Sequence, residues 1–141
     1  MQLGFFAQLG VHRRDYDMLV TKLEVEFCGS KNRSKDRPSG YWARPGNPTS
    51  LRIVFDISGY LMGCWIEVAE NEILYFNETY TVVAYFMLIT PEAWELIKDK
   101  IHIGMSMNAH AGSEIIGKAK LLEYKYYRSH EFVGGELILN E

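Results

Sequence analysis

Residues 19–27 read Leu-Val-Thr-Lys-Leu-Glu-Val-Glu-Phe, and this stretch decides the fold class. Within it, Leu23, Val25 and Phe27 alternate with Lys and Glu residues. Successive side chains of a β-strand point to opposite faces, so an alternation with a period of two predicts a strand with one buried face. We therefore predict a half-buried β-strand here.

The same alternation recurs along the chain and predicts further strands over 51–57, 64–68, 101–108 and 115–121. Residues 79–89 are apolar on both faces, which predicts a central strand covered on both sides. We expect the core faces to comprise Leu23, Val25, Phe27, Ile53, Phe55, Ile57, Val83, Tyr85 and Met87. Several short strands with little helix are typical of a barrel or a sandwich, so we predict an all-β fold.

One short helix is predicted to interrupt the strands. Thr90 suits the N-cap, Pro91 suits the first helical position, and Glu92 suits the positive end of the helix dipole. Trp94 and Ile97 then follow at helical spacing. Such a helix would close one end of the β structure.

Positive charge is concentrated between Gly29 and Thr49. The whole chain has 15 Lys and Arg residues against 18 Asp and Glu residues, a net charge of −3. The stretch 29–49 carries five cations and one acid, a net charge of +4 (5 − 1), so the remainder carries −7 (−3 − 4). Its Pro and Gly residues predict a long loop rather than a strand.

This basic loop, residues 29–49, is the best candidate for a functional site, because long loops in compact domains are often functional. Guanidinium groups attract carboxylates and phosphates, and aromatic rings offer stacking faces. The candidate partner-binding residues are Arg33, Arg37, Tyr41, Trp42 and Arg44. The alternative is a solvated connection whose aromatic residues anchor it to the β structure.

Length and composition indicate one soluble globular domain, with 141 residues of which 48% are hydrophobic and 23% charged. Cys28 and Cys64 are too few for a disulfide framework, and we expect reduced, partly buried thiols, although a single bridge stays open. No apolar run is long enough to span a bilayer, and no basic residue precedes the apolar N-terminal run. We expect a cytoplasmic protein that does not enter a membrane.

No pattern typical of an enzyme site stands out. Residues 112–118 fit the first seven positions of a phosphate-binding P-loop, but Ala119 stands where a magnesium-binding hydroxyl is required. We interpret 111–113 as a β-turn that leads into a strand. The four histidines are not spaced as zinc ligands, and His102 and His110 are expected on the surface. We therefore predict no catalytic residue, no metal and no cofactor.

Two stretches carry a family resemblance. Ser39-Gly40-Tyr41 with Arg44-Pro45 precedes a predicted strand and the turn Asp56-Ile57-Ser58-Gly59, and Ile115-Ile116-Gly117-Lys118-Ala119 follows a later turn. These motifs resemble the third domain of elongation factor Tu and related translation factors. The resemblance covers residues 19–124 and implies an antiparallel six-stranded β-barrel.

On this basis residues 1–141 are one domain, with a barrel core at 19–124 and flanking segments at 1–18 and 125–141. In the resembling family the domain helps to grip aminoacyl-tRNA. Glu114 stands where that family has an arginine, so the charge is reversed and tRNA binding is not expected to carry over.

We predict a non-catalytic binding module that engages a protein partner through the basic loop. The acidic remainder of the chain would repel a polyanion outside this loop, which favours a protein over RNA. Three alternatives stay open: an immunity-type protein that neutralises a toxin, a limited RNA-binding module, and a small enzyme whose site is assembled from scattered residues.

Overall fold

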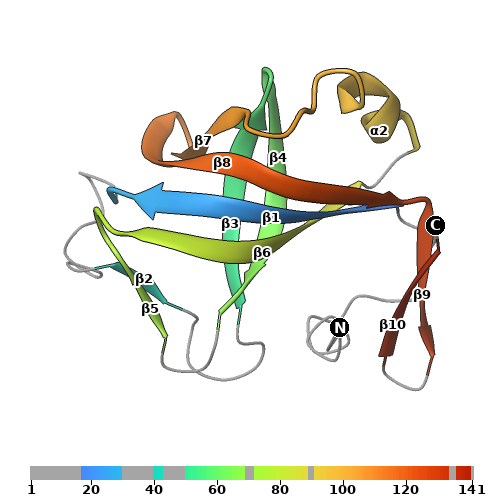
Figure 1. Cartoon of the computed structure of the whole chain (residues 1–141), viewed down its shortest axis with the longest axis horizontal. Helices are drawn as coiled ribbons and strands as arrows, with labels where there is room; N and C mark the ends of the chain where they lie inside the picture. Colours follow the sequence, from blue (N-terminus) through green and yellow to red (C-terminus); the bar gives the residue numbers. More distant parts are fainter. Residues whose placement is uncertain are drawn as a thin grey trace.

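Six strands close into an antiparallel β-barrel in this computed structural model, in the order β1-β6-β4-β3-β7-β8. Their bounds are β1 (Asp17–Phe27), β3 (Ser50–Ile57), β4 (Tyr60–Glu67), β6 (Thr79–Leu88), β7 (Ser106–Ala111) and β8 (Glu114–Tyr127). The long strands β8, β1 and β6 lie side by side and cross β3 and β4 (Figure 1). The structure describes residues 17–29, 40–42, 50–68, 72–88, 91–133 and 136–140. The predicted all-β class and the six-stranded barrel are confirmed.

Shorter elements surround the barrel. They are α2 (Pro91–Ile97), the two-stranded sheet of β2 (Gly40–Trp42) with β5 (Ile73–Tyr75), and the hairpin of β9 (Ser129–Val133) with β10 (Glu136–Asn140). The helix begins at Pro91, as predicted, while the proposed cap Thr90 lies outside the described residues. Ile97 of this helix is buried in the core.

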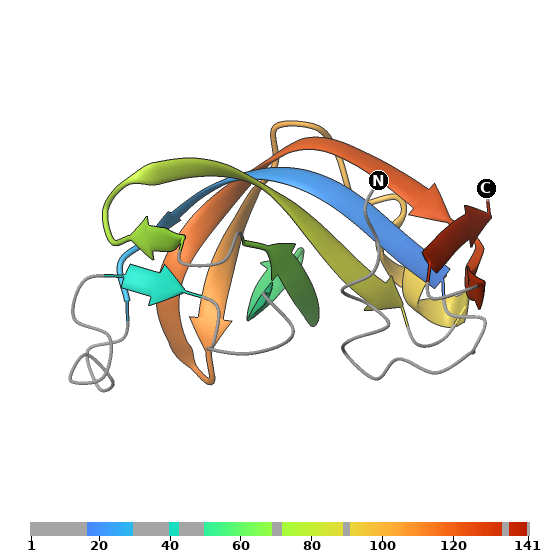
Figure 2. The same cartoon turned by 90° about the horizontal axis from the view of Figure 1, so that it is seen from below.

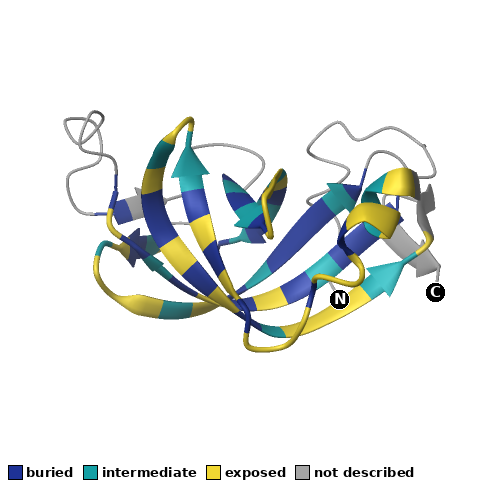
Figure 3. Ribbon diagram, turned by 90° about the horizontal axis from the view of Figure 1, so that it is seen from above, coloured by how far each residue is buried: buried dark blue, intermediate teal, exposed yellow. Residues whose placement is uncertain are grey.

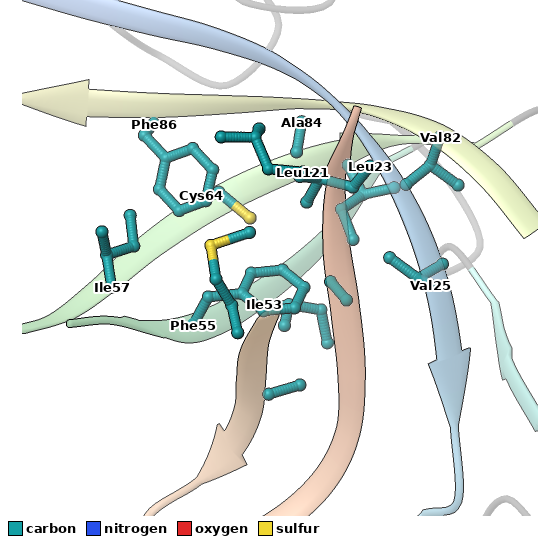
Figure 4. Packing of buried hydrophobic residues seen from close by; sticks show 14 of the residues in the cluster. Leu23, Val25, Ile53, Phe55, Ile57, Cys64, Val82, Ala84, Phe86 and Leu121 are labelled. Atoms are coloured by element: carbon teal, nitrogen blue, oxygen red, sulfur yellow. The ribbon is translucent and has the colours of Figure 1, made fainter. Parts of the chain in front are cut away.

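The core fills the barrel interior. Buried and exposed residues alternate along the strands (Figure 3), and the inward side chains of β1, β3, β4, β6 and β8 meet in one cluster (Figure 4). Phe55 is fully buried and faces Phe86 across this cluster, with ring centroids 6.2 Å apart. The predicted core faces of β1 and β3 are confirmed.

The predicted core face of β6 is wrong. Val82, Ala84 and Phe86 point into the barrel, whereas Val83 and Met87 are half-buried. Both faces of this strand are apolar, so alternation alone cannot select the inner face. The pairing with β4, which sets Cys64 opposite Phe86, selects it instead. Tyr85 is fully buried on the opposite face of the strand.

The strand predicted over 101–108 begins only at Ser106. Residues 98–100 and 103–104 form turns after α2, and the Ile101 amide donates to the Ile97 carbonyl oxygen at 3.1 Å. Gly104 has a φ of 89°, which interrupts an extended chain. Between 101 and 105 the apolar alternation therefore buries Ile101 and Met105 from irregular chain, and only residues 106–108 of the predicted strand belong to one.

Two further differences concern short or irregular strands. The basic loop contains β2, although this stretch was predicted to be loop alone, and the segment 125–141 contains the β9–β10 hairpin. In β8, Ile115 is 51% exposed while Ile116 is buried, because the β7–β8 register shifts between Ala109 and His110. A β-bulge of this kind moves the next residues to the other face.

Turns predicted at two hairpins are confirmed. Ser58 and Gly59 join β3 to β4 with φ values of 50° and 97°, and the Gly59 amide donates to Asp56 Oδ1 at 2.6 Å. Residues 112–113 join β7 to β8, and the residues after them are a strand, so the P-loop-like stretch lies on a hairpin.

In the described part of the chain, no helix has the length and hydropathy that crossing a membrane requires.

Candidate partner-binding surface

The structure places part of the predicted site. Tyr41 and Trp42 lie in β2, in the middle of the basic loop, whereas Arg33, Arg37 and Arg44 lie outside the described residues. The register of β2 with β5 sets Tyr41 opposite Leu74 and Trp42 opposite Ile73. Figure 2 shows these two strands side by side at one end of the barrel.

The β2–β5 sheet fastens the middle of the basic loop to the core. Leu74 of β5 is 1% exposed and belongs to the core cluster. A Cβ atom on Gly40 would clash with the Leu74 carbonyl oxygen and would lie 2.8 Å from Tyr75 Cα. Only glycine permits this approach of the two backbones, which gives a packing reason for the glycine of the Ser-Gly-Tyr motif.

The start of the basic loop is fixed at the same place. The amides of Cys28 and Gly29 both donate to the Ile116 carbonyl oxygen, at 2.8 and 3.2 Å. Gly29 has a φ of 76°, and a Cβ atom there would lie 2.6 Å from Cζ of Phe76, in the turn after β5. The Asn77 amide in that turn donates to the Phe27 carbonyl oxygen at 2.7 Å. Residue 29 and residues 40–42 are thus both held beside β5 and the turn that follows it.

Two hydrogen bonds through the Tyr80 hydroxyl connect the end of β5 to the start of β6. The Tyr75 amide donates to the Tyr80 hydroxyl oxygen at 3.0 Å, and that hydroxyl donates to Glu78 Oε2 at 2.8 Å. Burial and the neighbouring Glu78 carboxylate raise the pKa of Tyr80 above its ordinary value, so the hydroxyl stays protonated and remains a donor. Tyr75 itself is 45% exposed, directly opposite Gly40. An exposed aromatic residue of β5 therefore borders β2, on the face opposite to that of the buried Leu74.

Sequence reasoning missed Tyr75, Tyr80 and Glu78. The only signal was four apolar residues, 73–76, between Glu72 and Asn77, a run that is too short to show a period. Their relation to the basic loop depends on pairing between segments more than thirty positions apart, as in Gly40 with Tyr75.

Outside this region, aromatic and charged side chains meet on the outward-facing side of the barrel strands. Arg52 lies over the Trp65 ring at 5.3 Å from the ring centroid, and the buried Tyr85 hydroxyl donates to Glu67 Oε1 at 2.7 Å. Burial and Glu67 raise the pKa of Tyr85 well above its ordinary value. In each pair the two side chains satisfy each other, as is typical of contacts that stabilise a fold.

A second cluster joins α2 to β8 and the start of β1. The rings of Trp94 and Tyr126 stack at 4.3 Å with an interplanar angle of 5°, and the Tyr126 hydroxyl donates to the Asp17 carboxylate. Asp17 is only 7% exposed, so this bond supplies a partner for a buried carboxylate.

The cysteine and histidine side chains are the groups considered for catalysis or metal binding. Cys28 is exposed and Cys64 is buried, and both are free thiols. Burial raises the pKa of the Cys64 thiol well above its ordinary value. His102 is exposed as predicted, but both ring nitrogens of His110 are buried and make no hydrogen bond with any described residue, which corrects the expectation of a surface residue. Within the described ranges, His, Cys, Asp and Glu side chains form no group of three that could hold a metal ion.

No family model matches the chain, and no curated protein matches it.

Proposed function

We propose that this protein is a non-catalytic binding module, a stand-alone barrel related to the third domain of elongation factor Tu, that binds an acidic protein partner in the cytoplasm. Its partner-binding residues are Arg33, Arg37, Tyr41, Trp42 and Arg44. The observation that carries the proposal is the pairing of β2 with β5, because it fastens the middle of a loop with a net charge of +4 to the buried Leu74. Binding surfaces on loops are effective when a rigid scaffold positions them.

Chemistry supports an acidic protein as the partner. Arg and aromatic residues most often carry the binding energy of protein interfaces, and this loop combines them with the exposed Tyr75. The net charge of −7 outside the loop opposes a polyanion that extends beyond it. A partner with a compact acidic patch meets both conditions.

Two motif positions support the relation to the translation-factor barrel. Gly40 and Gly117 both sit where a side chain would collide with a neighbouring strand. The Asp56–Gly59 turn also joins two adjacent barrel strands, as the resemblance implies.

The first test captures partners from native lysate with the full chain as bait. A second bait carries Arg37→Glu and Arg44→Glu, and a third carries Trp42→Ala. The matched control carries Lys98→Glu and Lys100→Glu, which changes the net charge equally on exposed residues after α2. We expect one or a few proteins to bind the wild type and the control, and to be lost from the other two baits.

Affinity measured against salt then tests the mechanism on the captured partner. The Arg37/Arg44 double variant is expected to bind more weakly and with a flatter salt dependence, because fewer charge pairs form. Circular dichroism checks that the double variant folds like the wild type. Equal affinity with an equal salt slope contradicts the proposal, and capture that nuclease treatment abolishes points to RNA instead.

A further inference from the structure

Both strands of the β9–β10 hairpin are edge strands in the described part of the chain, and β10 is the second of them. The two strands pair only with each other in the described part of the chain, and β9 lies against β1 (Figure 1). The outer edge of β10 therefore carries backbone amide and carbonyl groups that the described strands do not pair. A two-stranded hairpin is marginally stable by itself, and a further strand would stabilise it.

The sequence of β10 lacks the residues that protect edge strands. It reads Glu136-Leu137-Ile138-Leu139-Asn140, with three aliphatic residues in succession. Natural edge strands usually carry Lys, Pro or an inward charge that prevents pairing with another chain. β10 carries none of these at its three central positions, so its edge is suited to accept a strand.

We propose that β10 pairs with β10 of a second copy of this chain, in antiparallel orientation and centred on Ile138. In this register Leu137 faces Leu139 of the other copy, and Glu136 faces Asn140. Aliphatic residues then oppose aliphatic residues, and a carboxylate opposes an amide that can donate to it. The result is a four-stranded sheet with two-fold symmetry, the commonest symmetry of homo-oligomers.

Charge disfavours two other ways of pairing this hairpin with itself. A parallel β10 pair would set Glu136 beside Glu136, and an antiparallel β9 pair centred on Glu131 would set Glu131 beside Glu131. Like charges directly opposite each other destabilise a sheet. Antiparallel pairing of β10 centred on Ile138 avoids both conflicts.

Sedimentation velocity of the full chain tests the proposal. A pair of five-residue strands buries less surface than a standard interface, so we expect a reversible dimer that forms between about 1 µM and 1 mM. Hydrogen exchange of the β10 amides should slow as the dimer forms, because their outer edge becomes paired.

Charged substitutions at Ile138, the proposed two-fold centre, test whether β10 forms the dimer interface. Ile138→Lys alone and Ile138→Glu alone should each weaken dimerisation by about tenfold or more, because like charges meet at the axis. An equimolar mixture of the two should restore association as a heterodimer. His130→Lys, on the neighbouring strand β9, is the matched control and should leave dimerisation unchanged.

Three outcomes overturn the proposal. The first is a wild-type chain that stays monomeric throughout this range, including one whose β10 amides are already protected by another segment of the same chain. The second is a dimer that Ile138→Lys does not weaken. The third is a mixture of folded Ile138→Lys and Ile138→Glu chains that does not associate.

Discussion

At the scale of single residues, Gly117 is a position where one methyl group matters. It lies in β8 opposite Phe27, and a Cβ atom there would lie 2.7 Å from Phe27 Cδ1 and 2.8 Å from the Glu26 carbonyl oxygen. Gly117→Ala should therefore lower the free energy of unfolding by about 1–3 kcal/mol, the usual cost of overpacking. Urea denaturation followed by circular dichroism measures it.

Gly63→Ala is the matched control, because the nearest atom that its Cβ would meet is Arg52 Nε at 4.0 Å. This variant should lose no stability, since alanine is less costly than glycine in a strand by about 0.5–1 kcal/mol. Equal effects of the two substitutions would mean that crowding does not explain Gly117.

Tyr126 gives the molecule a pH dependence at the alkaline end. Burial and the Asp17 carboxylate raise the pKa of Tyr126 above its ordinary value of 10.0, to about 12. A raised pKa in the folded state means that the native protein holds this proton more tightly. The resulting stabilisation is complete below pH 10 and is lost as the pH rises toward 12.

Tyr126→Phe isolates this effect, because Tyr85 titrates in both proteins and cancels in the difference. At neutral pH the variant should be less stable by about 1 kcal/mol, the net value of a hydrogen bond. The difference should shrink between pH 10 and pH 12, measured by denaturant unfolding across that range. A difference that stays constant with pH would contradict the assignment of the Asp17–Tyr126 bond.

At the scale of elements, the β3–β4 hairpin is the least attached part of the barrel. The two strands pair with each other along their whole length. Among the described residues, β3 meets β7 only at Val54–His110 and Phe55–Ala109, and β4 meets β6 only from Cys64 to Ile66. Few backbone bonds to neighbours favour opening of the hairpin as a unit.

Cys64 reports this opening, because its buried thiol faces the core and can react only when β4 moves away. In a Cys28→Ser background, which removes the exposed thiol, we expect slow labelling by a thiol reagent. The labelling rate gives the free energy of hairpin opening. This free energy and its dependence on denaturant concentration should both be lower than the values for global unfolding. A slope equal to the global value would show that the hairpin opens only when the whole barrel unfolds.

The same scale shows what the sequence could reveal. Alternation predicted β1 and β3 because each has one charged or polar face, and Pro91 with Glu92 predicted α2. It could not select the inner face of β6, which is apolar on both sides. The strands β2 and β5 are too short to show a period, and they pair only because Gly40 lets two distant segments approach.

The sequence predicted the charge of the candidate site but not the contacts that hold it in place. Composition alone identified the basic loop and its aromatic pair, since charge is a local property of the sequence. The hydrogen bonds among Tyr75, Tyr80 and Glu78 that brace its base depend on the fold.

At the scale of the whole molecule, the strand order affects how this chain folds while the ribosome synthesises it. β1 is the first barrel strand to be synthesised, yet both of its neighbours, β6 and β8, come much later in the sequence. Until β8 has left the exit tunnel, one edge of β1 has no partner strand, and its apolar face has only part of its cover. Long-range pairing of this kind slows folding and prolongs the exposure of strand edges. Nascent chains that stop before β8 are therefore the form of this protein with the greatest need of a chaperone.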